Sequence, residues 1–203
     1  MKLYYFLTPN ARKACAVAKH LGLKTDYQFV DLGKGEQHSP AFLAVNPNGR
    51  VPALEDDGRL VWESNAIMYY LARKAGSDLW PRDERELDVI RWLSWDLAHF
   101  TRYTNLLFFE RVIKPQIGLG EPSHDIVQDS LAQFRRNAPV LDAHLAGRSW
   151  VVGNALTVAD FALATYLPEA PLSGVPLGEF PHIERWHARM MQLPAWAQAF
   201  PAQ

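Results

Sequence analysis

The sequence predicts two domains, a small α/β sheet domain followed by an all-helical domain. Three observations lead to this prediction. Strand and helix patterns alternate in the first third of the chain, a turn-rich segment follows, and strand patterns are then absent. We therefore expect domains over residues 1–76 and 84–203, joined by a linker over residues 77–83.

The first domain is predicted from strand patterns, helix starts and turn residues. An aromatic strand ends at Thr8-Pro9, and apolar residues then recur at helical spacing. Later, two strand patterns flank Asp56-Asp57-Gly58, which is a strong hairpin signal. The expected elements are a strand over 2–7, a helix over 9–21, a strand over 27–32, a helix over 39–45, a hairpin over 51–62 and a helix from Ser64.

The second domain shows only helical periodicity, which predicts a helical bundle. Thr157 and Asp160 have the spacing of a capping box, with Asp in place of the usual Glu or Gln. The expected amphipathic segments are 84–113, 123–146, 157–167, 182–192 and 194–200.

Composition narrows the classes of partner. The chain has 21 basic and 22 acidic residues and a formal charge of −1, so we expect neither nucleic acid nor an anionic membrane as a partner. The start of the chain lacks a signal-peptide core, and a single cysteine fits a reducing compartment, so a cytoplasmic location is expected. The seven histidines show no metal-ligand spacing, and no metal is predicted.

Thr8-Pro9-Asn10 is the first pattern that suggests ligand binding. Proline favours the first helical position, which makes Thr8 the cap of the following helix. A helix start attracts anions and lowers thiol pKa values, and the Thr8 hydroxyl and the Asn10 amide could donate to a thiolate there. The alternative, which the local pattern alone favours, is a well-capped helix that binds nothing.

Two further patterns are each open to a ligand-binding and a purely structural interpretation. Val51-Pro52 opens a hairpin strand, where a cis proline would leave the Val51 backbone free to pair with an extended peptide. Glu63-Ser64 stands at a strand-to-helix junction, where Ser64 as the cap could bind a carboxylate and Glu63 an ammonium group. The structural alternative is an ordinary edge-strand proline at Pro52 and an ordinary helix cap at Ser64.

The order and spacing of these patterns resemble the glutathione transferases. The similarity covers nearly the whole chain and implies a thioredoxin-like α/β domain followed by an all-α domain. The resembling segments are Leu3–Phe6, Asn46–Leu54, Glu63–Leu71, Leu79–Asp83 and Trp150–Asp160.

The resemblance implies a set of glutathione contacts, with glutathione as co-substrate and no cofactor. Val51, before Pro52, would pair with the cysteinyl backbone, and Glu63 and Ser64 would hold the γ-glutamyl end. Gln37 and Arg50 stand where the family often contacts the glycyl end.

The thiol-activating position distinguishes subgroups of the family. Thr8-Pro9-Asn10 resembles the bacterial Nu-type members, which are linked to glutathione-dependent disulfide reduction, and assigns the catalytic role to Thr8 and Asn10. Tyr5 is the alternative thiol partner, although it lies earlier in the chain than the Tyr-type members require. Cys15 lies on the apolar stripe of its helix and is expected to be a core residue.

The pocket for the second substrate has only a helical pattern to indicate it. The spacing of Trp92, Asp96, His99 and Tyr103 predicts one helix face, and His99, Phe100 and Tyr103 are candidates for an electrophile pocket. The resemblance implies a homodimer that acts on a small hydrophobic electrophile or a disulfide. The alternative is a non-catalytic binding or regulatory protein on the same scaffold.

Overall fold

The computed structural model describes residues 1–201, so the last two residues of the predicted helical domain lie outside the described part. The chain forms two compact units. One unit contains Met1–Pro81 together with the chain from Gln192 onward, and the other contains Arg82–Met191. The domain prediction placed the C-terminal residues with the helical domain, whereas the structure groups them with the first unit.

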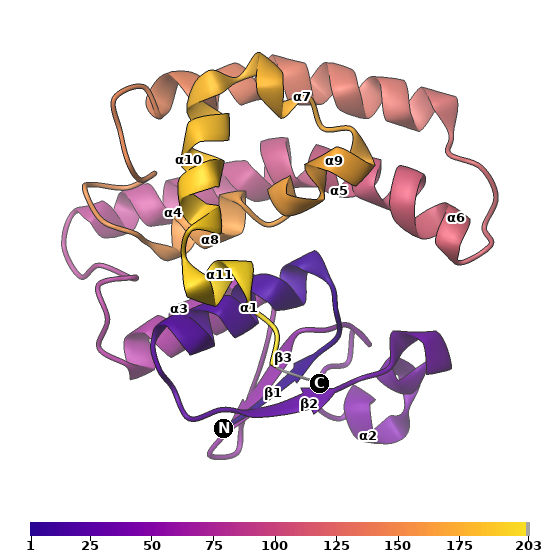
Figure 1. The fold of residues 1–203 in the computed structure, drawn as a ribbon. Coiled ribbons are helices and arrows are strands. Elements are labelled where there is room, and N and C mark those ends of the chain that lie inside the picture. The colour runs from indigo at the N-terminus through magenta and orange to yellow at the C-terminus, as the bar shows by residue number, and fades with distance from the viewer. Residues whose placement is uncertain (202–203) are drawn as a thin grey trace. The chain divides into compact units, whose positions relative to one another are not determined.

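The first unit is built on a four-stranded sheet with the strand order β2-β1-β3-β4 (Figure 1). Strand β1 pairs in parallel with β2 and antiparallel with β3, and β3 and β4 form the predicted hairpin. The strands are β1 (Lys2–Tyr5), β2 (Asp26–Phe29), β3 (Ala53–Asp56) and β4 (Arg59–Trp62). Each expected strand is therefore present: β1, β2 and β3 are shorter than expected, and β4 ends at Trp62, where the expected hairpin ends.

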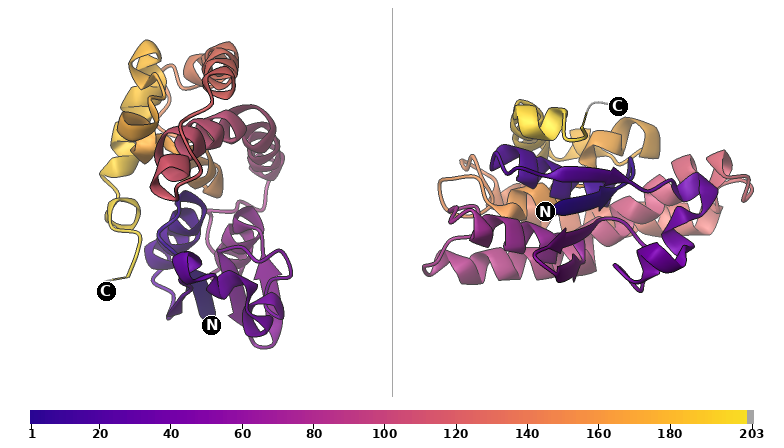
Figure 2. Two further views of the ribbon diagram at one scale, coloured as in Figure 1. Left: turned by 90° about the vertical axis from the view of Figure 1, so that its right-hand side faces the viewer. Right: turned by 90° about the horizontal axis from the view of Figure 1, so that it is seen from below.

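Helices cover both faces of this sheet (Figures 1 and 2). Leu3 and Leu54 are partners in adjacent strands and are fully buried on the face covered by α1 (Pro9–His20) and α3 (Ser64–Lys74). Because side chains alternate along a strand, Tyr4 points to the opposite face. There its ring packs edge-on against Phe42 of α2 (Pro40–Leu43), with 5.8 Å between ring centroids.

The helical unit contains one long, interrupted helical run and a second long helix packed beside it. The run consists of α4, α5 and α6, with π-helical turns at Asp96–Phe100 and Phe109–Ile113 between them. The helices of this unit are α4 (Arg85–Trp95), α5 (Thr101–Phe108), α6 (Lys114–Gln116), α7 (His124–His144), α8 (Val158–Leu163), α9 (Ala170–Ser173) and α10 (Pro181–Met191).

The π-helical turn at Asp96–Phe100 corrects one expectation. An uninterrupted helix would have placed Trp92, Asp96 and His99 on one face. In the structure Trp92 and Asp96 are buried whereas His99, which lies within the wider turn, is exposed, because that turn has more residues per turn than an α-helix.

The C-terminal segment packs on the first unit through α11 (Pro194–Ala197). Trp196 is fully buried, and the Arg12 guanidinium of α1 lies 5.2 Å from the centroid of its ring. Phe200 stacks on Tyr5 at the end of β1, with ring centroids 6.0 Å apart. The segment thus contributes to the core that supports α1.

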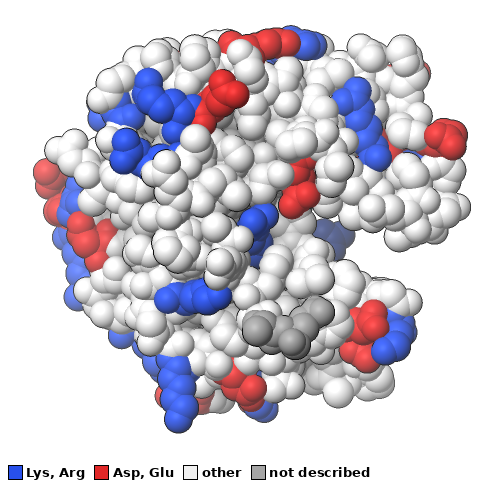
Figure 3. All heavy atoms as spheres, in the orientation of Figure 1, with Lys and Arg blue, Asp and Glu red and all other residues white. Residues whose placement is uncertain are grey.

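The surface carries no dominant charge on the face shown in Figure 3, where basic and acidic side chains are interspersed. This distribution agrees with the formal net charge of −1. Within residues 1–201, no helix combines the length and apolarity that a bilayer-crossing segment needs.

Candidate functional site

The start of α1 holds an unsatisfied hydroxyl. Thr8 occupies the predicted N-cap position with an extended backbone, and Pro9 follows as the first helical residue. Contrary to the prediction, the Thr8 side chain makes no capping hydrogen bond, and its Oγ1 is buried without a partner among the described residues. A buried polar group left unpaired costs about 1–3 kcal/mol, so this hydroxyl is available to a ligand acceptor.

The start of α3 differs from the prediction in its cap. Glu63, not Ser64, occupies the N-cap position, and its φ of 70° is unusual for a residue with a side chain. The chain therefore enters the helix through a strained residue, and such strain often accompanies a functional site. Ser64 becomes the first helical residue, and its Oγ donates to Asn10 Oδ1 over 3.4 Å. This contact joins the starts of α1 and α3.

The loop before β3 is organised by a residue that sequence reasoning treated only as part of a turn. Asn46 is buried, its amide donates to the Arg50 carbonyl over 2.6 Å, and its Oδ1 accepts from the Asn48 N–H over 3.0 Å. The Val51-Pro52 bond that follows is cis. Among the described residues, no hydrogen bond involves the Val51 backbone N–H or C=O.

The same loop lies against the segment that contains Gln37. Gly49 has a φ of +60°, and a Cβ on it would stand 3.1 Å from both the Gln37 carbonyl and His38 Nδ1. Glycine is therefore required for this close approach. Gln37 Oε1 is buried without a partner in the described part of the chain, and Arg50 is exposed. The structure thus brings the two predicted glycyl-end regions together and adds His38 beside them.

Cys15 and Tyr5, the alternative thiol partner, both lie in the core. Cys15 is fully buried, as predicted, and burial raises the pKa of its thiol to about 12. Tyr5 is buried among Tyr27, Phe29 and Phe200, and this burial raises the pKa of its phenol. Neither side chain is suited to act as a thiolate or phenolate near neutral pH.

The three candidates for an electrophile pocket differ in burial. Phe100 is fully buried between Trp95 and Phe134, so we leave it out of the proposed site. His99 is exposed, and Tyr103 is half-buried with the Arg102 guanidinium 5.8 Å from its ring centroid.

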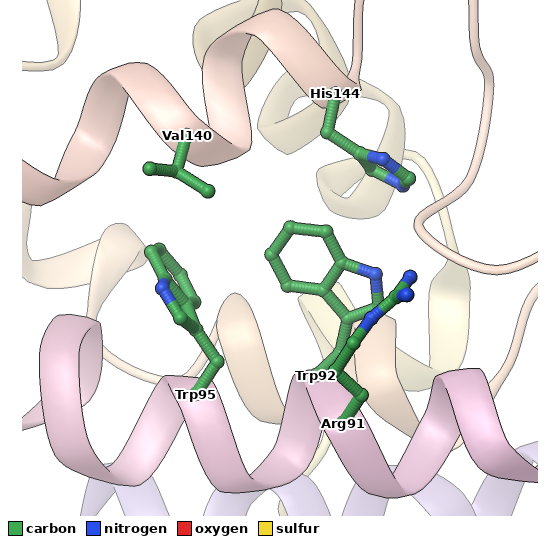
Figure 4. Close-up of a pocket in the computed structure, with 5 residues that line it drawn as sticks. All are labelled: Arg91, Trp92, Trp95, Val140 and His144. Carbon is green, nitrogen blue, oxygen red and sulfur yellow. The ribbon is translucent and has the colours of Figure 1, made fainter.

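A cavity of about 250 Å³ lies between α4 and α7, and none of the three predicted pocket residues is among the residues that line it (Figure 4). Trp92 and Trp95 form its aromatic floor, and Val140 and His144 face them from α7. His144 is held by a 2.7 Å hydrogen bond between its Nε2 and the Val151 carbonyl. The cavity is thus an apolar recess with a fixed imidazole and the Arg91 side chain at its edge.

Within residues 1–201, no group of three or more His, Cys, Asp or Glu side chains is placed to hold a metal ion. The first unit offers two helix starts, a loop with an unpaired Val51 backbone, and the buried, unpaired side-chain oxygens of Thr8 and Gln37. Such an arrangement suits an extended, peptide-like ligand with charged ends.

Comparison with known proteins agrees with this interpretation. Residues 1–73 match the family model described as the glutathione S-transferase N-terminal domain, and residues 103–194 match the model of its C-terminal domain. Over 210 residues, the sequence is 32% identical to glutathione S-transferase 3 of Zea mays, covering all of this chain and 94% of that protein. It is 31% identical to glutathione S-transferase D7 of Drosophila melanogaster, covering 98% of this chain and 88% of that protein.

A solved structure shows the same fold. Glutathione S-transferase I from maize, in complex with an atrazine glutathione conjugate, superposes with a TM-score of 0.87 at 26% identity. The match covers 98% of this chain and 95% of the maize chain. The predicted architecture, a thioredoxin-like α/β domain followed by an all-α domain, is confirmed, and the chain belongs to the glutathione S-transferase family.

Proposed function

We propose that this glutathione transferase activates the glutathione thiol at the start of α1, through Thr8 and Asn10. The observation that carries the proposal is the buried, unpartnered Thr8 hydroxyl beside a helix start that contacts the start of α3 through Ser64 and Asn10. The helix dipole and the hydroxyl would both favour the thiolate over the thiol.

The remaining contacts follow the length of the tripeptide. Ser64 and the first-turn N–H groups of α3 would bind the γ-glutamyl carboxylate, and Glu63 its ammonium group. The unpaired Val51 backbone, next to Pro52, would pair with the cysteinyl residue, and Gln37 and Arg50 would bind the glycyl carboxylate.

In conjugation, the thiolate sulfur forms a bond to an electrophilic carbon while the leaving group departs with the electron pair of the bond that breaks. The thiol proton passes to solvent when glutathione binds. The Thr8 hydroxyl acts by donating a hydrogen bond to the sulfur, so it needs no change of its own protonation state. The maize relative in complex with an atrazine glutathione conjugate supports this reaction class.

Disulfide reduction is the second candidate, and the buried Cys15 favours a version without a protein thiol. The thiolate of one glutathione would attack a disulfide sulfur, forming a mixed disulfide and releasing a thiolate. A second glutathione thiolate would then attack the glutathione sulfur of the mixed disulfide, releasing the other substrate thiolate and leaving oxidised glutathione.

Binding and turnover can be tested separately. Calorimetric titration with glutathione should show one site per chain, and Thr8→Ala should lower kcat about 10- to 100-fold by removing a hydrogen bond to a charged group. Thr8→Ser is the matched control and should retain most of the activity. Unchanged turnover in a Thr8→Ala/Asn10→Ala variant would refute the thiol assignment.

The same measurements distinguish the alternatives. Absence of glutathione binding at millimolar concentration would refute the transferase assignment. Binding without turnover of either a chloro-aromatic electrophile or a model disulfide would indicate a non-catalytic binding protein. The ratio of the two activities ranks conjugation against disulfide reduction.

The proposal includes a cytoplasmic homodimer. Exposed large apolar side chains support it: Leu60, Trp62 and Tyr69 on β4 and α3 of the first unit, and Leu87, Ile90 and Val140 on α4 and α7 of the helical unit. Exposed apolar side chains gathered on a few elements are typical of an interface. Light scattering should give the mass of two chains, and Trp62→Lys should shift it toward one chain; a monomeric wild type would refute the dimer.

A further inference from the structure

Lys13 is a fully buried lysine close to the proposed glutathione site. It lies on α1, one turn after Asn10, and its exposed fraction is 0%. Its Nζ donates to the side-chain oxygen of Asn65 on α3 over 2.8 Å. A buried ammonium group carries a desolvation cost that a methionine of similar length would avoid, so filling space does not account for the charge.

The Lys13–Asn65 bond fixes the orientation of the Asn65 side chain. A lysine ammonium group has donors only, so the oxygen of the Asn65 carboxamide must face it. The NH₂ group of Asn65 is then on the side away from Lys13. Asn65 directly follows Ser64, so this NH₂ group belongs to the same helix turn as the proposed γ-glutamyl contacts.

Two contacts therefore join the first two turns of α1 to the first turn of α3. Ser64 contacts Asn10, and three residues further along α1 Lys13 contacts Asn65. Residues three apart lie on the same face of a helix, so both contacts cross the same side of α1. The Ser64–Asn10 contact alone is long at 3.4 Å, whereas the Lys13–Asn65 bond is short and charge-assisted.

We infer that Lys13 is a positioning residue for glutathione binding. It holds Ser64 and Asn65 at the start of α3 in a fixed position relative to Thr8 and Asn10 at the start of α1, and it presents the Asn65 NH₂ group as a further donor to the γ-glutamyl carboxylate. This inference rests on the proposed function, because it concerns the same ligand.

The test compares Lys13→Met and Lys13→Arg with the wild type. Lys13→Met should raise the Kd and the KM for glutathione about tenfold, while kcat at saturating glutathione stays within about twofold, because the lost contact acts on binding and not on the thiol. Lys13→Arg keeps the charge and the donors and should recover most of the affinity. Lys24→Met, at an exposed position in the loop after α1, is the matched control and should change neither constant.

Asn65 provides an independent check if Lys13→Met fails to fold. Asn65→Asp keeps an acceptor for Lys13 but replaces the NH₂ group by a negative oxygen, so its Kd for glutathione should rise at least as much. An unchanged Kd in folded Lys13→Met or in Asn65→Asp would overturn the inference, as would a fall in kcat at constant KM. A wild type that does not bind glutathione identifies a failure of the proposed function instead, since that result is obtained before any variant is made.

Discussion

Asp56, at the end of β3, is kept ionised by three neighbours. The Lys74 ammonium group is hydrogen-bonded to it, the Tyr70 hydroxyl donates to it over 2.9 Å, and the Met1 amino group lies 3.8 Å away. The bond from Lys74 is the largest of the effects that lower the Asp56 pKa below its ordinary value. This carboxylate ties the hairpin to α3.

The lowered pKa predicts how Asp56 contributes to stability as pH changes. The contribution is fully present above the ordinary pKa of about 4 and is lost as pH falls through the lower pKa of the folded state. Asp56→Asn should therefore lower the free energy of unfolding by about 1–3 kcal/mol at pH 6, and by clearly less at pH 3. Urea unfolding of both proteins at the two pH values measures this; an equal difference at both would contradict it.

Single residues also show where prediction from sequence stops. The cap position of Thr8 follows from Pro9, because both signals are local. The unsatisfied state of its hydroxyl depends on atoms far away in the chain and has no local signal. Glu63 shows the same limit: the sequence placed the cap one residue later, since a positive φ at a glutamate contradicts its intrinsic preference and is imposed by the surrounding fold.

At the scale of single elements, the start of α8 is anchored by a buried carboxylate. The predicted capping box of Thr157 and Asp160 is present. Beyond the box, Asp160 Oδ1 accepts from the Val151 N–H over 2.9 Å and from Trp186 Nε1 over 3.0 Å. One buried carboxylate thus connects α8, the preceding loop and α10, although burial raises its pKa to about 6.

Removing this carboxylate should be strongly destabilising. Asp160→Ala leaves several buried donors without an acceptor, so we expect the free energy of unfolding to fall by about 3–5 kcal/mol. Asp160→Asn keeps one acceptor oxygen and should lose less. Thermal unfolding followed by circular dichroism measures both; a loss below about 1 kcal/mol in the alanine variant would show that the network is dispensable.

Elements were predictable where their signals were short-range. The hairpin around Asp56-Asp57-Gly58 and the helix after Pro9 have such signals, and both are present. The π-helical turns at Asp96–Phe100 and Phe109–Ile113 left no such signal, because each arises within a continuous amphipathic pattern. The prediction that Trp92, Asp96 and His99 share one helix face was wrong because it assumed an uninterrupted α-helix.

On the scale of the molecule, the first unit is discontinuous in sequence. Its sheet and helices come from the start of the chain, whereas Trp196, buried beside Arg12, comes from the end. The turn-rich linker over residues 77–83 predicts that everything after it belongs to the helical domain. Periodicity identifies helices but gives no information about which core a terminal helix joins.

The discontinuity predicts that truncation after Met191 affects the distant α1. Loss of Trp196 and Phe200 removes two aromatic side chains from the packing of α1 and β1, so the first unit should lose about 3–5 kcal/mol of stability and bind glutathione more weakly. Hydrogen exchange of α1 amides reports the change directly. Trp196→Ala should show a smaller effect in the same direction, and unchanged α1 exchange in the truncated chain would contradict the prediction.

The return of the chain to α1 also bears on synthesis at the ribosome. The strands and α1 emerge first, yet the tryptophan that completes their core is translated only after the whole of Arg82–Met191. Until then, the apolar surface of α1 that receives Trp196 is open to the cellular environment, while Arg82–Met191 can already fold. A premature stop codon between Met191 and Trp196 would therefore damage the glutathione-binding half of the molecule, although every residue proposed to contact glutathione had been made.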